Sequence, residues 1–315
     1  MAPGISFFGP EEVAAALKWP ALVSAIEDIL REPEATAPER TVHTIPDASG
    51  NDAALLLKPG WVVGELIAIK AVTFFPDNGA LELPTINAGV LLFSGADGTF
   101  LGACDGNELT TRRTAAASAV AAKRLARADA KRLLVVGTGA LSPMTALAHC
   151  SVREYDQVDV WGRDSDKALR VSNRLITENI SATAVDDLDA AVAAADVITC
   201  VTGATSPLVK GALLKPGAHV DLIGAFTPEM RESDDDVIRR GTVFLDTRSD
   251  GSLSGDIAQP LKSGVMTMDD VVADLAELVN GSHPGRTNDD EITVFKSAGF
   301  ALEDVAAAKL VFADR

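Results

Sequence analysis

The chain has 315 residues, of which 47% are hydrophobic and 23% are charged, a composition typical of a globular protein with room for two hydrophobic cores. Its 45 acidic and 28 basic residues give a formal net charge of −17. This excess excludes a nucleic-acid partner, because binding to a phosphate backbone needs clustered cations. No uncharged run reaches the roughly 18 residues that cross a bilayer, and the N-terminal sequence has no basic region followed by an apolar core. We therefore expect a cytoplasmic protein without a membrane partner.

Cysteine and histidine are too sparse and too scattered to indicate a metal site. The three cysteines form no CxxC pair, and no two of the four histidines have the spacing of a helical zinc pair. We expect reduced, buried thiols and no bound metal.

The first hundred residues predict a helix followed by antiparallel strands. Apolar residues recur at helical intervals over Pro10–Leu30, which predicts an amphipathic helix interrupted near Pro20. From Arg40 to Gly102, short apolar runs alternate with Asp, Asn, Gly and Pro clusters, which is typical of a β meander. The segments Asp77–Gly79 and Gly95–Gly98 carry turn residues, so both predict hairpins.

The rest of the chain alternates between helical and β patterns. The run after Leu109 is rich in Ala and free of Gly and Pro, and it predicts one long helix leading out of the β region. The alternation that follows predicts a parallel sheet covered by helices, with strands at Arg132–Gly137, Val158–Trp161, Val197–Val201, Val220–Ile223 and Val243–Leu245. A polar loop beyond Gly281 then leads to a last helix, Leu302–Phe312, which we place back on the first domain.

A glycine-rich turn follows the first of these strands. The segment Gly137-Thr138-Gly139-Ala140-Leu141-Ser142 has the pattern GxGxxS between an apolar strand and a helix. Gly137 would allow the tight turn, Gly139 the approach of a pyrophosphate, and Ser142 close packing of the helix on the strand. A lone GxG also occurs in plain β-turns, but strand before and helix after favour a dinucleotide site.

The ends of two further strands would complete that site. Gly162, Arg163 and Asp164 follow the second strand, about twenty residues after the glycines, where a carboxylate usually binds the ribose of NAD. Arg163 could pair with a 2′-phosphate and favours NADPH, whereas Asp164 leaves NADH open. The alternative is that Arg163 is a solvated loop cation. Val201 and Thr202 end the fourth strand, where the nicotinamide ribose would lie.

Several segments together resemble the ornithine cyclodeaminase and mu-crystallin family, which includes cyclodeaminases, some alanine dehydrogenases and ketimine reductases. The resemblance covers nearly the whole chain. It rests on Arg40, on Lys70 in IAIKAV, on LPT at Leu83–Thr85, on LTTRRTAAASA at Leu109–Ala119, on GTGALSP at Gly137–Pro143, on GAFTPEMRE at Gly224–Glu232 and on FKSAG at Phe295–Gly299.

The resemblance implies the fold class and the domains. It implies an α/β protein in which a Rossmann domain, a doubly wound parallel sheet, is inserted in an α+β domain for substrate binding and dimerisation. With the patterns above, this places the substrate domain at residues 1–118 together with 290–315, and the dinucleotide-binding domain at 119–289. A homodimer is expected on the same ground.

The site residues follow from matching positions in the family. Arg40 and Arg113 resemble the ligands of the substrate carboxylate, Lys70 resembles a further substrate contact, and Thr85 a residue of the substrate pocket. Lys70 and Arg113 are the expected catalytic residues. Thr114 and Ser297 join the expected cofactor residues. By position alone, Arg112 and Arg113 could both be an exposed basic turn, whereas a lone lysine in the apolar run around Lys70 would be costly to bury without a partner.

One difference from the family separates two activities. Family cyclodeaminases carry a catalytic Asp two places before the Pro of the GxxxP segment, where this chain has Phe226. Phenylalanine cannot relay a proton, and closing a ring from ornithine needs a general acid–base group. Asp221 and Glu232 lie nearby in sequence and could supply one.

The sequence resembles most closely the bacterial Δ1-pyrroline-2-carboxylate reductases. That resemblance predicts reduction of Δ1-pyrroline-2-carboxylate, or of the six-membered piperideine, to L-proline or L-pipecolate with NADPH or NADH. The substrate would be a cyclic imino acid or an amino acid. The alternatives are an ornithine cyclodeaminase that uses NAD⁺ and releases ammonia, an alanine dehydrogenase, and a non-catalytic binder like mu-crystallin.

Overall fold

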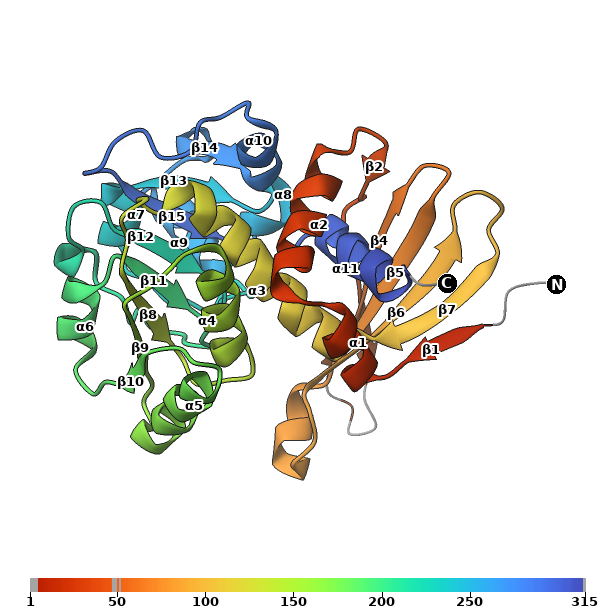
Figure 1. Cartoon of the computed structure of the whole chain (residues 1–315), viewed down its shortest axis with the longest axis horizontal. Coiled ribbons are helices and arrows are strands. Elements are labelled where there is room, and N and C mark those ends of the chain that lie inside the picture. Colours follow the sequence, from red (N-terminus) through yellow and green to blue (C-terminus); the bar gives the residue numbers. More distant parts are fainter. Residues whose placement is uncertain (1–4, 47–49, 51, 314–315) are drawn as a thin grey trace. The chain divides into compact units, whose positions relative to one another are not determined.

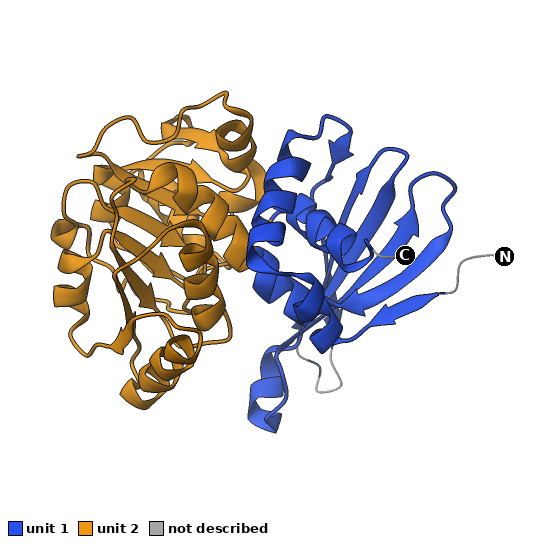
Figure 2. Ribbon diagram, in the orientation of Figure 1, with its two compact units in different colours: residues 1–113, 300–315 blue, residues 114–299 orange. Residues whose placement is uncertain are grey.

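The computed structural model describes residues 5–46, 50 and 52–313. The chain divides into two compact units, shown in separate colours in Figure 2. Unit 1 comprises Met1–Arg113 and Phe300–Arg315, and unit 2 comprises Thr114–Gly299. The division falls within one helix, α3 (Gly106–Leu125), which is the long helix that the Ala-rich run predicts.

Unit 1 is built on a seven-stranded sheet in the order β1-β7-β6-β5-β4-β2, with β3 paired to β4. Neighbouring strands are antiparallel, as the meander pattern predicts, except that β1 runs parallel to β7. The strands are β1 (Ser6–Phe8), β2 (Ala35–Thr36), β3 (Thr41–Pro46), β4 (Asp52–Val62), β5 (Leu66–Phe74), β6 (Ile86–Ser94) and β7 (Phe100–Asp105).

Helices of unit 1 include α1 (Pro10–Ala16), α2 (Trp19–Arg31) and α11 (Ala301–Val311). The single interrupted helix expected over residues 10–30 is thus two helices. The break lies at Leu17 and Lys18, before Pro20, because Pro20 occupies the first turn of α2, where its missing N–H costs nothing. Helix α11 is the predicted last helix, and it packs against α2, β4 and β5 within unit 1 (Figure 1).

Both predicted hairpins pair antiparallel strands, but only one of them has the predicted tight turn. The turn at Gly95–Gly98 joins the antiparallel strands β6 and β7. Strands β5 and β6 also pair, but their link holds the 3-10 helix η1 (Pro76–Leu81) instead of a tight turn at residues 77–79. Asn78 connects the two ends of this link. Its side-chain amide donates to the backbone carbonyl of Pro84, and its backbone carbonyl accepts from the N–H of Leu83.

Unit 2 is an eight-stranded parallel sheet in the order β10-β9-β8-β11-β12-β15-β13-β14. The five predicted strands are confirmed, and β10, β14 and β15 were not predicted. The strands are β8 (Arg132–Val136), β9 (Gln157–Trp161), β10 (Ala182–Ala184), β11 (Val197–Cys200), β12 (His219–Leu222), β13 (Gly241–Leu245), β14 (Val271–Asp274) and β15 (Ile292–Lys296).

Both faces of this sheet are covered by helices. Leu133 and Val135 of β8 belong to one hydrophobic cluster, whereas Leu134 and Val136 belong to another. The first cluster includes residues of α4 and α5, and the second includes residues of α6, α7 and α9. Unit 2 is therefore a doubly wound α/β fold of the Rossmann type, and the predicted fold class is confirmed. Its other helices are α4 (Leu141–Val152), α5 (Ser165–Thr177), α6 (Leu188–Ala194), α7 (Asp235–Arg240), α8 (Arg248–Gly251), α9 (Gly255–Ser263) and α10 (Leu275–Asn280), with the short 3-10 helices η2 (Gly211–Leu213) and η3 (Met268–Asp270).

Strand β15 corrects one predicted boundary. We expected residues 290–299 to belong with the last helix, but β15 pairs with β12 on one side and β13 on the other, inside the sheet of unit 2. The strand was not predicted because its sequence contains two polar residues. Thr293 is buried with its hydroxyl donating to the carbonyl of Leu125, and Lys296 is buried 3.4 Å from a carboxylate oxygen of Asp256.

None of the helices in the described part of the chain has both the length and the apolar character needed to cross a bilayer.

Candidate active site

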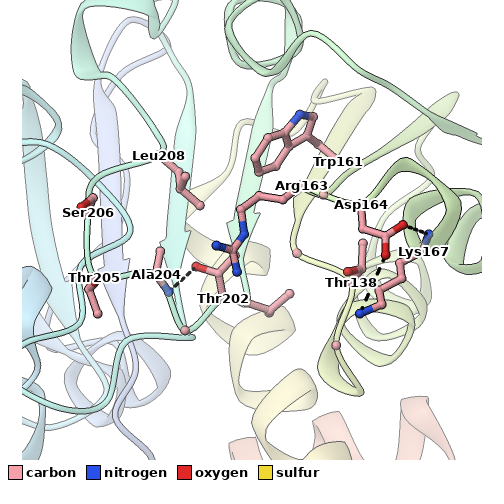
Figure 3. A pocket seen from close by; sticks show the side chains of 15 residues that line it. Thr138, Trp161, Arg163, Asp164, Lys167, Thr202, Ala204, Thr205, Ser206 and Leu208 are labelled. Carbon is pink, nitrogen blue, oxygen red and sulfur yellow. Dashed lines mark hydrogen bonds and ion pairs between the residues drawn. The ribbon is translucent and has the colours of Figure 1, made fainter.

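A pocket of about 570 Å³ opens at the carboxyl edge of the sheet in unit 2 (Figure 3). Three loops form it, and they follow β8, β9 and β11, which are neighbours in the sheet. Ligands of doubly wound sheets bind at this edge. The lining residues are Gly137, Thr138 and Gly139; Trp161, Gly162, Arg163, Asp164 and Lys167; and Val201 to Ser206 with Leu208.

The loop after β8 has the backbone that the glycine pattern predicts. Gly137 has a φ of +128°, and a Cβ there would lie 2.8 Å from the carbonyl oxygen of Val201, so a larger residue would not fit. A Cβ on Gly139 would meet nothing within 4 Å, which leaves open space for a ligand to approach the backbone. The hydroxyl of Ser142 donates to the carbonyl of Gly137 at 2.8 Å and ties the start of α4 to the strand end.

The loop after β9 and the first turn of α5 each place one cation at the pocket. Arg163 forms no ion pair among the described residues, and Figure 3 shows its side chain extending towards Thr202. Lys167, in the first turn of α5, also lines the pocket. Asp164 is the N-cap of α5: its Oδ1 accepts from the backbone N–H of Lys167 at 3.1 Å, and its Oδ2 lies 3.9 Å from the ammonium of Lys167.

The pocket brings together most of the predicted cofactor residues. Thr114, Ala140, Leu141 and Ser297 do not line it. Ala140 is the N-cap of α4 and Leu141 its first residue, while Thr114 is buried in α3. Ser297 is buried, with its hydroxyl donating to Asp246 at 3.1 Å. Sequence reasoning placed Gly203 beside Thr202 at the end of the fourth strand, and it missed Trp161, Lys167, Leu208 and the segment 204–206. Of these, only Lys167, a cation four residues after Arg163, left a recognisable signal.

Unit 1 holds a second cluster, built on Lys70 and Arg113. Lys70 of β5 faces Lys58 of β4, and both side chains are buried at Asp304 on α11. The ammonium of Lys70 lies 2.7 Å from Oδ1 of Asp304, and that of Lys58 lies 3.7 Å from Oδ2. Arg113 places Nε 2.8 Å from Asp304 Oδ1 and Nη1 2.6 Å from Glu303 Oε2. Arg113, and not the partly exposed Arg112, is therefore the buried guanidinium; Arg112 pairs with Glu108.

Burial and mutual charge set the ionisation of this cluster. Burial, helped by the neighbouring charge of Arg113, lowers the pKa of Lys70 well below its ordinary value, although Asp304 opposes the shift. Burial alone would raise the pKa of Asp304, but the charges of Arg113, Lys70 and Lys58 hold it below the usual range for an aspartate. Asp304 therefore stays ionised and orients the cations around it.

The cluster includes three residues that sequence reasoning missed. Lys58, Glu303 and Asp304 are all buried. Acidic residues opening a helix are common on surfaces, so Glu303 and Asp304 gave no sign of a site. The signal available was the burial implied by the apolar residues on every other side of the helix ALEDVAAAKLV.

The remaining predicted substrate residues lie apart from one another along the chain. Arg40 is half-buried in the link between β2 and β3. Thr85 precedes β6, and its carbonyl accepts from the backbone N–H of Phe75 at 2.8 Å. Phe226 follows β12 in unit 2 with 40% of its surface exposed, so it is not a core aromatic residue.

The two carboxylates near Phe226 in sequence both accept hydrogen bonds from buried groups of the protein. Asp221 is fully buried and accepts from the hydroxyls of Ser118 and Thr199. Glu232 is fully buried and accepts four hydrogen bonds from the ends of β11 and β12. Neither carboxylate reaches a surface from which it could deprotonate a substrate.

Comparison with known proteins gives one consistent result. The family model described as "Ornithine cyclodeaminase/mu-crystallin family" matches residues 9–315. The Delta(1)-pyrroline-2-carboxylate reductase of Colwellia psychrerythraea is 35% identical over 96% of both chains. A solved structure of the Thermococcus litoralis Delta(1)-pyrroline-2-carboxylate reductase with NADH and L-proline aligns with a TM-score of 0.91 and 30% identity, over 98% of this chain and 96% of that one. An archaeal alanine dehydrogenase, solved as a dimer with bound NAD, aligns with a TM-score of 0.91 and 27% identity, over 98% and 95% of the two chains.

The fold of unit 2 and its pocket define a Rossmann-type dinucleotide-binding architecture. The chain belongs to the ornithine cyclodeaminase/mu-crystallin family, as the motifs of its sequence predict.

We predict that Asp304→Ala lowers the free energy of unfolding by about 3–5 kcal/mol, because it leaves buried cations without their carboxylate. The pKa of Asp304 is lowered, so this stabilisation is present above the ordinary aspartate pKa of about 3.9 and is lost as the pH falls below it. Urea unfolding at neutral pH measures the change. Asp189→Ala removes an exposed pair with Lys210 and should change stability by less than about 1 kcal/mol. Equal losses in the two variants would contradict the role given to Asp304.

Proposed function

We propose that this protein reduces a cyclic ketimine carboxylate, Δ1-pyrroline-2-carboxylate or its six-membered homologue, to L-proline or L-pipecolate with NADPH or NADH. The protein is an oxidoreductase that uses a nicotinamide dinucleotide. Its family, its pocket and the cofactors bound in similar structures all support this assignment.

The observation that carries the choice of a reductase is Phe226. A cyclodeaminase must deprotonate an amine and expel ammonia, which needs a general acid–base group. Phe226 occupies the family position of that group and is partly exposed, while the nearby Asp221 and Glu232 are buried and engaged. A substrate that is already a closed, unsaturated ring needs no such group.

The cluster around Asp304 suits a substrate with one carboxylate. In their charged forms Lys58, Lys70 and Arg113 carry three positive charges, and Glu303 and Asp304 carry two negative ones. Buried cations favour the carboxylate of a substrate as a further partner. Arg113 offers a planar fork suited to a carboxylate, and Lys70 would contribute charge near the imine nitrogen.

Besides binding the carboxylate, these side chains need only favour protonation of the imine nitrogen. When bound, NADPH or NADH supplies a hydride to the imine carbon, and the ring nitrogen takes up a proton. A protonated imine accepts hydride more readily than a neutral one, so a cation and an ordered proton source near the nitrogen favour the reaction. Because the pKa of Lys70 is lowered, its ammonium can release a proton more easily than an exposed lysine.

The decisive assay follows NADPH and NADH oxidation with Δ1-pyrroline-2-carboxylate, beside L-ornithine plus NAD⁺ assayed for ammonia. We expect rapid oxidation and no ammonia. Arg113→Lys keeps the charge but loses the fork, and it should raise the KM for the imine by about tenfold or more while cofactor affinity stays within about twofold. Formation of ammonia and proline from ornithine would show that the protein is a cyclodeaminase and would refute the proposal. Tight binding of a small molecule without turnover of any imine would indicate a binding protein.

We further propose that Arg163 and Lys167 bind the 2′-phosphate of NADPH. Both side chains line the pocket beside the end of β9, and Asp164 is held as a helix cap. Two cations with a capped carboxylate favour a phosphate over a ribose hydroxyl pair.

Arg163→Asp should therefore lower the ratio of kcat/KM for NADPH over NADH by about tenfold or more, because a charge-assisted contact becomes a repulsion. Steady-state rates with each cofactor give the ratio. Arg170→Asp makes the same charge change on the exposed side of α5, away from the pocket, and serves as the matched control. A ratio unchanged by Arg163→Asp would remove this residue from cofactor selection.

A homodimer through the open face of the sheet in unit 1 is also proposed. The strand register places Phe7, Ala103, Leu91, Ile69 and Pro59 in one cross-strand row. The row of Lys70 and Lys58 lies on the opposite face, which α11 covers. Phe7 is 71% exposed and Leu91 is 39% exposed. An apolar row with this exposure favours contact with the same row of a second copy of the chain.

Leu91→Glu should therefore convert a dimer into a monomer, since the two-fold contact would place two charges in an apolar interface. Light scattering after size-exclusion chromatography measures the mass. Leu169→Glu, at an exposed leucine on α5 of unit 2, should leave the mass unchanged. A monomeric wild-type protein, or a dimer that tolerates Leu91→Glu, would refute this interface.

A further inference from the structure

Glu232 connects the ends of two neighbouring strands through one buried carboxylate. Its Oε1 accepts from the backbone N–H of Thr202 at 2.6 Å and from the Thr202 hydroxyl at 2.9 Å. Its Oε2 accepts from the backbone N–H groups of Gly224 and Ala225 at 2.7 and 3.2 Å. Thr202 follows β11 and Gly224 follows β12, so one side chain holds both strand ends at the carboxyl edge of the sheet.

The surroundings fix this carboxylate in place. A Cβ on Gly224 would lie 2.2 Å from the nitrogen of Thr202, so only glycine allows the two loops to come this close. The backbone N–H of Glu232 donates to Asp256 Oδ1 at 2.8 Å, and its carbonyl accepts from Leu208 and Val209. The side chain of Glu232 therefore has little freedom to adopt another position.

The consequence for the pocket is the direction of one hydroxyl. Thr202 lines the pocket, and its O–H is donated to Glu232, so its oxygen can only accept on its other side. The backbone N–H of Ala204 is 3.3 Å from that oxygen and occupies one lone pair (Figure 3). The remaining lone pair suits a donor, such as a ribose hydroxyl or the amide of a nicotinamide.

We propose that Glu232 is a positioning residue that sets the affinity of the pocket for the nicotinamide-riboside half of the cofactor, acting through Thr202. The inference rests on the proposed function only in requiring a nicotinamide dinucleotide. It does not depend on which imine is reduced.

Ionisation of Glu232 makes the effect dependent on pH. Burial raises the pKa of Glu232 to about 7, with Asp256 of α9 adding to the shift while Lys296 of β15 and the donors of Thr202 oppose it. The thiol of Cys200 on β11 also lies close, and burial keeps it protonated by raising its pKa. Protonated Glu232 would donate a hydrogen to Thr202, and the hydroxyl would then turn its own hydrogen towards the pocket. Cofactor affinity should therefore fall as the pH decreases through about 7.

The test compares NADH with 5′-AMP, which lacks the nicotinamide riboside, by fluorescence titration and calorimetry at about pH 8, where Glu232 is ionised. Glu232→Gln should weaken NADH about tenfold or more and change AMP less than about twofold, since an amide cannot accept from both strand ends. Asp196→Asn is the matched control. Asp196 directly precedes β11 and accepts from the backbone N–H groups of Lys131 and Arg132 at the amino edge of the sheet, the edge opposite to the pocket. It should leave the ratio of NADH to AMP affinity unchanged.

The pH profile gives a second readout that loss of stability alone would not produce. Wild-type affinity for NADH should decline between about pH 8 and pH 6, and this decline should be absent in Glu232→Gln. Thr202→Val should give the same selective loss, and the double variant should be no worse than either single one, because both act on one contact. Equal weakening of NADH and AMP by Glu232→Gln, or a selective loss of NADH affinity in Asp196→Asn, would overturn the positioning role. Failure of the wild-type protein to bind both NADH and NADPH would refute the proposed function as well, whereas binding of either cofactor without imine reduction would refute only that function.

Discussion

Backbone N–H groups at the ends of parallel strands need acceptors, and this protein meets that need with buried carboxylates. Asp196 accepts from two N–H groups at the amino edge of the sheet in unit 2. Glu232 and Asp246 do so at the carboxyl edge, where Asp246 accepts from Ala298 and Gly299. A buried ionised carboxylate is tolerated when several donors share its charge. Part of the acidic excess of the chain therefore lies inside the fold, where it holds loops in position and does not act as a surface field.

The sequence separation of the interacting residues explains why the glycine-rich pocket of unit 2 was largely predictable and the cluster around Asp304 was not. Gly137 and Gly139 act through their own backbone, directly after an apolar strand, so a short segment of sequence contains the whole signal. Lys70 and Asp304 are 234 residues apart, and their contact exists only because α11 returns to the sheet of unit 1. No local pattern records such a pairing. Lys70 and Arg113 were found through the family resemblance, and their carboxylate partners became visible only in the structure.

Strand β15 shows a second limit of local patterns. Its sequence Ile-Thr-Val-Phe-Lys is apolar except for Thr293 and Lys296, and the polar residues before it favoured a loop. In the fold both polar residues are fully buried, because Thr293 meets the carbonyl of Leu125 and Lys296 meets Asp256. A central strand of a parallel sheet is usually apolar throughout. The exception is possible here only because tertiary partners from distant segments satisfy each polar group.

Some buried polar groups of unit 2 only stabilise the fold, whereas others can also bind a ligand. Ser118, His149 and Asp221 have the composition of a catalytic triad, and the Ser118 oxygen lies 2.7 Å from Nε2 of His149. All three are fully buried, however, so no substrate can reach them. The single hydrogen of the Ser118 hydroxyl is donated to Asp221, so it is not available to His149 as a general base. Thr202 differs because its hydroxyl is donated inwards to Glu232 while its oxygen lines the pocket. Access to the pocket together with remaining hydrogen-bonding capacity, and not the identity of the residues, marks Thr202 as a candidate ligand contact.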